Sequence, residues 1–382
     1  MQSNKLRMAI RSTAAVAILG VAAQANAVSF ETGGYETDIY GYARLGASYD
    51  IDSNQALSTR SGSYTGLANN DDAPDGHFGA DAFQSRIGLK TVTPEGLTMN
   101  VEGDFRGSGG GALRLRHAYG SYNGVLMGQT WSNYSSFVGN TATLDFDSLP
   151  GYAGYQSRTA QARYTTGALS FSLEDPQNSL LDPTGAAADT KDSLPAFTAR
   201  LEDSQGGLSY SAAILAHQVG YDDGTNDDSS MGFATFGALK MALSDMITIQ
   251  GTVSYTDGAN SYLYRSGENF GAASAYVDAS GDVETISGYG GSVGAGFNLG
   301  DGRSINIGYG IVTVDWDDAE DDLGAAAVAD QSETNSAIMA NYQWTPVKNV
   351  MMGVEYQFLK RENVSGDDGD ANRILFAAQY NF

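Results

Sequence analysis

Apolar and polar residues alternate with a period of two along most of this chain. Ile87 and Leu89, for example, share one parity, and Arg86 and Lys90 share the other. The same alternation returns in the last segment, residues 374–382. Successive side chains of a strand point to opposite faces, so the pattern predicts strands with one apolar and one polar face. Each segment is about 9–12 residues long, which suits a tilted membrane crossing.

We count about sixteen such segments, joined by connections that alternate strictly between long and short. Long polar connections follow the odd-numbered segments, and turns of about two to five residues follow the even-numbered ones. A β-helix or propeller would show a repeated sequence period, and none is visible. The sequence therefore predicts an all-β fold, a transmembrane antiparallel up-and-down β-barrel of about sixteen strands with long external loops and short periplasmic turns.

Composition narrows the alternatives. The chain has 48 glycines, 22 tyrosines, only 7 prolines and no cysteine, which favours many strands and excludes disulfides and thiolate metal sites. A mean hydropathy of −0.26 excludes an α-helical membrane protein but permits a barrel, because half of each barrel strand faces water. The net charge of −24 argues against nucleic acid as a partner. A secreted acidic all-β protein is the alternative that composition also permits.

The first residues predict export. Lys5, Arg7 and Arg11 form a basic head, an apolar core of about eleven residues follows, and Ala27 ends a small-residue cleavage site. We expect this signal peptide to be removed and the mature chain to reach the cell outer membrane. The predicted divisions are a cleaved signal peptide (1–27), a short periplasmic N-terminal segment (28–37) and the barrel domain (38–382).

One long stretch without alternation interrupts the barrel pattern, from Trp131 to Gln156. A loop this long with no pattern of its own is unusual in a compact domain and indicates a function. It carries two carboxylates, Asp145 and Asp147. We expect this third external loop, residues 131–156, to fold into the lumen and to form the constriction of a pore.

Basic residues gather on the polar parity of the first half of the chain. These predicted pore-lining residues are Arg44, Arg86, Lys90, Arg106, Arg114, Arg116, Arg163 and Arg200. A basic wall facing an acidic loop would favour anionic solutes, and the arginine fork suits carboxylates. The alternative is that Glu102, Asp104 and Asp145 neutralise these cations and leave no selectivity.

Catalysis and metal binding receive little support. Of the three histidines, His77, His117 and His217, His117 has the parity of Leu113 and Leu115 and is expected to face lipid or a neighbouring subunit. No spacing singles out a serine nucleophile, so no enzyme is expected.

Four acidic runs are expected in external loops, and no cofactor is expected. The runs are Asp71–Asp75, Asp222–Asp228, Asp315–Asp322 and Asp367–Asp370. None has the spacing of a calcium loop. Divalent cations that bridge these loops to lipopolysaccharide are favoured, and a specific calcium site stays open as the alternative.

Several strings resemble the DcaP-like family of outer-membrane porins: "GQTWSNY", "TLDFDSLPG", "SRTAQARYT" and "FSLEDP", with "YGYARLGASYDI" and "LRLRHAYGSY". The resemblance is clearest over residues 38–176. It implies a homotrimer of sixteen-stranded barrels that takes up small anions, dicarboxylates in particular. By position, the family's basic lumen residues correspond to Arg44, Arg86, Arg114, Arg116 and Arg163. Family members can carry a long coiled-coil extension, but here only residues 28–37 precede the barrel.

The resulting hypothesis is an outer-membrane porin for passive diffusion of small hydrophilic solutes, with a preference for anions such as dicarboxylates. Its expected partners are outer-membrane lipid, lipopolysaccharide, two further copies of the chain and small anionic solutes. Two alternatives stay open. One is a non-selective general porin, and the other is a structural surface barrel whose lumen the long loop plugs.

Overall fold

The computed structural model describes residues 27–53, 59–69 and 75–382. The predicted signal peptide, apart from Ala27, and most of the acidic run Asp71–Asp75 lie outside the described residues.

Eighteen strands form one antiparallel sheet. Those before the first long interior loop are β1 (Val28–Thr32), β2 (Tyr35–Asp50), β3 (His77–Asp81), β4 (Arg86–Val92), β5 (Thr98–Gly107), β6 (Ala112–Tyr122) and β7 (Val125–Trp131). Those after it are β8 (Arg158–Thr166), β9 (Leu169–Glu174), β11 (Ala196–Gln205), β12 (Leu208–Asp222), β13 (Asp227–Ala242), β14 (Ile247–Asp257), β17 (Ser287–Gly300), β18 (Arg303–Val314), β19 (Ser332–Val347), β20 (Val350–Asn363) and β21 (Asp368–Asn381).

The sheet closes on itself because β2 pairs with the last strand, β21, on one side and with β3 and β4 on the other. β3 and β4 share one position in the wall, and β1 pairs only with β2. Among the described residues, the wall therefore has sixteen strand positions, and the prediction of a sixteen-stranded barrel is confirmed. The segment 28–37, expected to precede the barrel, forms β1, a turn and the first residues of β2.

Alternation explains the two faces of the wall. Leu113, Met127, Val253 and Val293 are 61–69% exposed on the outer face, although all four are apolar. Polar residues of the same strands, such as Gln250, are buried on the inner side. Apolar side chains that face out and polar ones that face in are the pattern of a membrane-spanning barrel.

The strict alternation of long and short connections is wrong in detail. The acidic segment after residue 222 was expected to be a long loop, but β12 and β13 pair along their whole length and leave only residues 223–226 between them. The connections 108–111 and 364–367 are short for the same reason. Continued ladder pairing satisfies backbone polar groups, so the strands extend past the apolar part of the wall.

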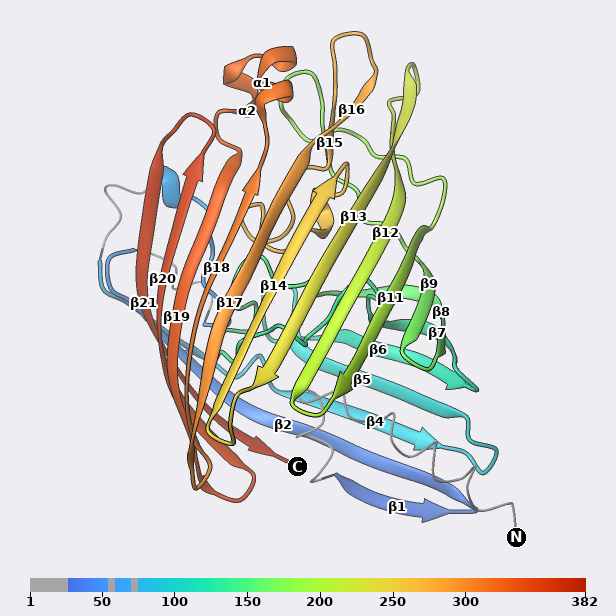
Figure 1. Ribbon diagram of the computed structural model, residues 1–382, viewed down its shortest axis with the longest axis vertical. Helices are drawn as coiled ribbons and strands as arrows, with labels where there is room; N and C mark the ends of the chain where they lie inside the picture. Colours follow the sequence, from blue (N-terminus) through green and yellow to red (C-terminus); the bar gives the residue numbers. More distant parts are fainter. Residues whose placement is uncertain (1–26, 54–58, 70–74) are drawn as a thin grey trace.

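Small elements cover one end of the barrel. They are the three-stranded sheet of β10 (Leu180–Leu181), β15 (Ala275–Val277) and β16 (Val283–Thr285), the 3-10 turns η2 (Leu67–Asn69) and η3 (Asn260–Tyr262), and the helices α1 (Asp317–Leu323) and α2 (Ala325–Val328). Figure 1 places α1, α2, β15 and β16 at the end opposite the C-terminus and β1. Within the described ranges, no helix is long and apolar enough to cross a membrane.

Candidate functional site

The connection between β7 and β8, residues 132–157, crosses the interior of the barrel and is called the β7–β8 loop below. The Leu144 N–H donates to the Glu355 carboxylate of β20 (2.7 Å). On another part of the wall, the Thr252 hydroxyl of β14 donates to the Gly151 carbonyl (2.6 Å). The loop thus contacts strands far from its own in the barrel order and narrows the lumen.

Two glycines of the inner wall make this close approach possible. A Cβ atom at Gly353 of β20 would lie 2.8 Å from the Leu144 side chain, and one at Gly310 of β18 would lie 2.3 Å from the Pro150 carbonyl oxygen. Heavy atoms that are not bonded to each other cannot approach this closely, so a side chain at either position would clash with the loop. The glycines therefore leave the space in which the loop lies.

Asp145 anchors the loop through hydrogen bonds within the protein. Its side chain is 3% exposed and accepts hydrogen bonds from the Gly62 N–H (2.9 Å), the Ser148 N–H (2.8 Å) and the Gln357 amide (2.8 Å). Burial raises the pKa of Asp145, although Arg265 acts in the opposite direction. The carboxylate is fully occupied within the protein.

Asp147 forms an ion pair with Arg60 (2.5 Å) and accepts a hydrogen bond from the Ser61 hydroxyl. Burial alone would raise the pKa of Asp147, but the charges of Arg60 and Arg265 outweigh it and hold that pKa below its usual value. Asp147 therefore stays ionised inside the barrel, paired with a residue of the β2–β3 connection that sequence reasoning did not select.

Three of the predicted basic residues share two carboxylates. Arg116 is 1% exposed and lies 2.7 Å from Glu102 and 3.0 Å from Asp104. Arg114 also pairs with Asp104 (2.7 Å), and Arg86 pairs with Glu102 (3.2 Å). For these residues, the neutralising partners considered above are present.

Three further arginines donate hydrogen bonds to backbone carbonyl oxygens. Two of these oxygens belong to the β7–β8 loop, and the third belongs to Trp131, the residue before the loop. The donor–acceptor pairs are Arg44 with Leu144 (2.8 Å), Arg163 with Trp131, and Arg200 with Ser135. Carbonyl oxygens carry no full charge, so these hydrogen bonds anchor the loop without neutralising the guanidinium groups. Arg200 also lies 3.9 Å from the carboxylate of Glu202, which compensates part of its charge.

The last two predicted basic residues, Arg106 and Lys90, differ in their ion pairing. Arg106 lies 3.5 Å from Asp81 and 5.8 Å from the ring centroid of Phe83. Lys90 is half-buried on β4 and makes no ion pair with any residue that the structure describes.

Arg158, the first residue of β8, is a member of this group that sequence reasoning missed. Its guanidinium carbon lies 4.3 Å from the ring centroid of Trp131, its neighbour across the β7–β8 pair. The charges of Arg86, Arg114 and Arg116 are close enough to repel that of Arg158. Within the described part of the chain, Arg158 makes no ion pair. Arg158 is a basic residue at the start of a predicted strand, so the sequence offers it as a candidate. Its parity is opposite to that of Arg163, the residue selected in the same strand.

The expectation that His117 faces outward is wrong. A β-bulge places both Arg116 and His117 opposite Glu102, since the register passes from Glu102–His117 directly to Gly103–Leu115. A bulge of this kind reverses the parity of the residues beyond it. The His117 ring consequently lies 3.8 Å from Glu102 and 3.0 Å from the Thr130 hydroxyl.

The described histidines and acidic loops are the remaining candidates for holding a metal ion. His217 is buried, with its Nε2 atom 2.8 Å from the Gly258 carbonyl oxygen. Across the described ranges, no group of three or more histidine, aspartate or glutamate side chains is placed to hold a metal ion. Divalent cations at the acidic loops stay a prediction.

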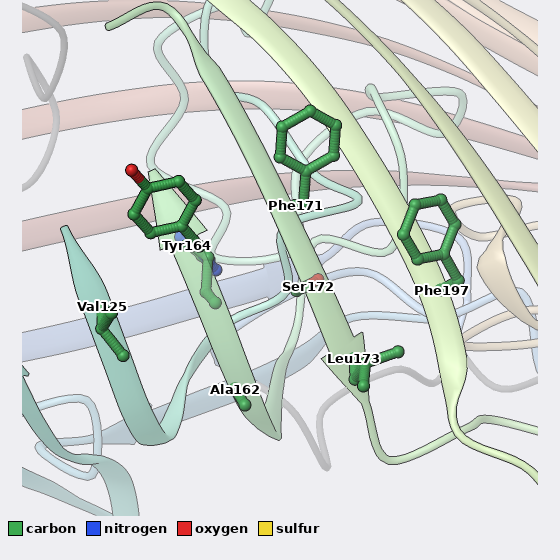
Figure 2. Close-up of a pocket in the computed structure, with 8 residues that line it drawn as sticks. Val125, Ala162, Tyr164, Phe171, Ser172, Leu173 and Phe197 are labelled. Carbon is green, nitrogen blue, oxygen red and sulfur yellow. The ribbon is translucent and has the colours of Figure 1, made fainter. Parts of the chain in front are cut away.

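One apolar hollow lies on the outer face of the wall. Figure 2 shows Tyr164, Phe171 and Phe197 projecting from β8, β9 and β11 around it. These aromatic side chains are 39–50% exposed. Its lining also includes Arg163, whose guanidinium group donates to the Trp131 carbonyl.

The comparisons with known proteins agree with this geometry. The family model of the DcaP outer membrane protein matches residues 25–382. No curated protein matches the sequence. Among solved structures, the outer membrane channel DcaP of Acinetobacter baumannii is 27% identical, with 92% of this chain and 99% of that chain covered and a TM-score of 0.78.

Two more distant structures share the fold. The anion-selective porin from Comamonas acidovorans is 12% identical, with 91% of this chain and 100% of that chain covered and a TM-score of 0.57. A trimer form of the Vibrio cholerae outer membrane protein OmpT is 14% identical, with coverage of 91% and 100% and a TM-score of 0.52. Since the matched model spans nearly the whole barrel, this chain belongs to the DcaP outer membrane protein family, a family of outer-membrane β-barrel channels.

Proposed function

We propose that this channel passes small hydrophilic solutes by diffusion and prefers anions, dicarboxylates in particular. The supporting observation is the cluster of Arg86, Arg114, Arg116 and Arg158, called the arginine cluster below. Among the residues that the structure describes, its four guanidinium groups face two carboxylates, Glu102 and Asp104. Two positive charges are thus left without a protein counter-ion at the cluster, which matches the charge of a dicarboxylate.

The arginine cluster lies where the β7–β8 loop leaves the wall, because Arg158 and Trp131 flank that loop. A fixed positive charge in a narrow, partly dehydrated passage attracts anions and repels cations more strongly than the same charge in bulk water. The two spare charges would hold a dicarboxylate only briefly, because conduction requires binding weak enough for the solute to leave.

The test is electrical. The refolded chain is inserted in planar lipid bilayers, and the reversal potential is measured in a potassium chloride gradient. We expect the sign of the reversal potential to show that chloride is more permeant than potassium. Added succinate should interrupt the current, whereas succinamide, of similar size and without charge, should not.

A matched pair of variants sharpens the result. Arg114→Gln removes one charge of the cluster, and its side chain is 33% exposed, while Arg303→Gln removes an exposed charge from the β17–β18 turn. Only the first should weaken the anion preference. A channel with no preference would favour the general porin, and a folded barrel without current would favour the structural alternative.

We also propose the processing and surroundings of the mature protein. Export would remove residues 1–27, and the outward apolar faces would contact outer-membrane lipid, with the acidic loops bridged to lipopolysaccharide by divalent cations. Three copies would form a homotrimer through walls and loops. N-terminal sequencing and light scattering of the protein extracted from outer membranes test the cleavage site and the number of subunits.

A further inference from the structure

Three connections from different parts of the chain meet inside the barrel. They are the β2–β3 connection, the β7–β8 loop and the β14–β17 connection. The Tyr64 N–H of the first donates to the Glu268 carbonyl of the third (2.9 Å), and the Gly151 N–H of the second donates to the Tyr264 carbonyl of the third (3.0 Å). The rings of Tyr152 and Tyr264 stack with centroids 6.3 Å apart. The β7–β8 loop is thus held by two other connections as well as by the wall.

Arg265, in the β14–β17 connection, lies at the centre of this meeting point. It is 1% exposed, and the two arms of its guanidinium group go to different connections. One arm donates to the Ser148 carbonyl of the β7–β8 loop, and the other donates to the Gly62 carbonyl of the β2–β3 connection. The guanidinium carbon also lies 4.8 Å from the ring centroid of Tyr64. Because the fork is planar and rigid, it fixes the distance between the two connections.

The backbone at Arg265 adopts a strained conformation that aims this side chain. Its φ angle is +63°, in the left-handed region that residues other than glycine rarely adopt. Such a conformation persists only where neighbouring contacts enforce it. The Asn335 amide of β19 supplies one such contact by donating to the Arg265 carbonyl (2.9 Å).

Electrostatic attraction is a second interaction between Arg265 and the β7–β8 loop. Burial alone would lower the pKa of Arg265, but Tyr64, Asp145 and Asp147 outweigh it and raise that pKa above its usual value. The Arg265 guanidinium therefore acts on both buried aspartates of the β7–β8 loop, as Arg60 does. Arg44 also acts on Asp145, and Arg106 also acts on Asp147. Without Arg265, each carboxylate would lose one of its neighbouring cations.

We propose that Arg265 is a positioning residue that sets the aperture of the channel, by tying the β7–β8 loop to the β2–β3 connection. It does so from the lumen side, without being the residue that meets the solute. This inference rests on conduction through the lumen, as in the proposed function. If the tie is removed, the loop is held by fewer contacts, and the passage beside it becomes wider.

The experiment measures single-channel conductance of the full chain in planar bilayers, with neutral polyethylene glycols of graded size to find the largest that enters. Arg265→Gln should shift the size limit upward and raise the conductance, because glutamine carries no charge and cannot reach both carbonyls. Arg265→Lys keeps the charge but not the fork and should give a smaller shift. Arg303→Gln, in the exposed β17–β18 turn, should match the unaltered chain.

A rescue experiment separates positioning from general stability. In Arg265→Ala, added guanidinium chloride at millimolar concentration should restore the original size limit, whereas sodium chloride should not. Heat-dependent gel mobility shows that each variant is a folded barrel. If Arg265→Gln does not fold, Arg265→Lys decides the question.

An unchanged size limit in folded Arg265→Gln or Arg265→Lys would overturn the proposal. Absence of current in the unaltered chain would instead contradict the proposed function, so the two failures are distinguishable.

Discussion

Two arginines of the arginine cluster differ in what surrounds them. Arg116 is buried and lies 2.7 Å from Glu102 and 3.0 Å from Asp104, so its charge is already compensated within the wall. Arg158 packs on Trp131 and makes no ion pair among the residues that the structure describes. An arginine above an aromatic ring keeps its charge available to a further anion. Arg116 should therefore stabilise the wall, and Arg158 should act on the solute.

We expect substitutions of these two residues to have different effects. Arg116→Gln leaves Glu102 and Asp104 short of a buried partner and should lower the free energy of unfolding by about 3–5 kcal/mol. Arg158→Gln removes a buried charge that three arginines repel, so it should not lower the free energy of unfolding but should weaken anion preference. Urea unfolding and reversal potentials measure the two effects. Normal selectivity in Arg158→Gln would refute the role given to Arg158.

The sequence indicated which arginines share a face but not which of them are paired. Parity alone placed Arg86, Arg114 and Arg116 together, and the structure keeps them together. Their pairing depends on the register between β5 and β6, which sets Asp104 opposite Arg114. No local pattern reports that register. Arg158 was missed because a residue at a strand end need not follow the parity of the strand.

At the scale of elements, the strands were predictable and the interior contacts were not. A strand with one apolar and one polar face leaves a period-two pattern, and the wall strands followed it. No sequence pattern indicates the bulge at Arg116, so the prediction that His117 lies on the outer face is wrong. The anchors of the β7–β8 loop, such as Glu355 and Arg265, lie more than a hundred residues away in sequence. Nothing near the loop in the sequence identifies them.

The β7–β8 loop should respond to acid in a defined order. Burial raises the pKa of Asp145, so Asp145 is protonated first as the pH falls, and this step removes no folded-state stabilisation. Asp147 behaves oppositely. Burial opposes its ionisation, but Arg60 and Arg265 hold its pKa below the usual value. Its contribution to stability is therefore complete above its unfolded pKa and is lost as the pH falls through its lowered folded pKa.

We therefore expect conductance and polymer size limit to stay constant from neutral pH down to about pH 4 and to rise below it. The other charged groups near the two aspartates are Arg44, Arg60, Arg106, Arg265 and Glu355, and the arginines do not titrate in this range. Asp147→Asn should show the wider passage already at neutral pH. A transition above pH 5 in the unaltered chain that persists in Asp147→Asn would contradict this assignment.

At the scale of the whole molecule, a solute on the proposed path would meet two fields of opposite sign. The chain carries a net charge of −24, and the helix α1 has exposed carboxylates that include Asp317, Asp318 and Asp321. This helix lies at the end of the barrel opposite the C-terminus (Figure 1). The arginine cluster lies within the wall. An anion that enters from the α1 end must therefore pass an acidic region before it reaches a basic one. The measured selectivity is the balance of the two.

Salt should shift that balance in a direction that identifies the two fields. The Debye length is about 10 Å at 0.1 M and about 3 Å at 1 M, so salt screens the exposed carboxylates much more than the half-buried arginines. Anion preference should therefore increase with potassium chloride concentration, whereas a channel with one exposed basic site would lose preference. Asp317→Asn combined with Asp318→Asn and Asp321→Asn should raise anion preference at low salt and flatten the dependence. If anion preference instead decreases with salt in both the unaltered chain and the triple variant, the carboxylates of α1 do not act on the solute. The arginine cluster alone then sets the preference.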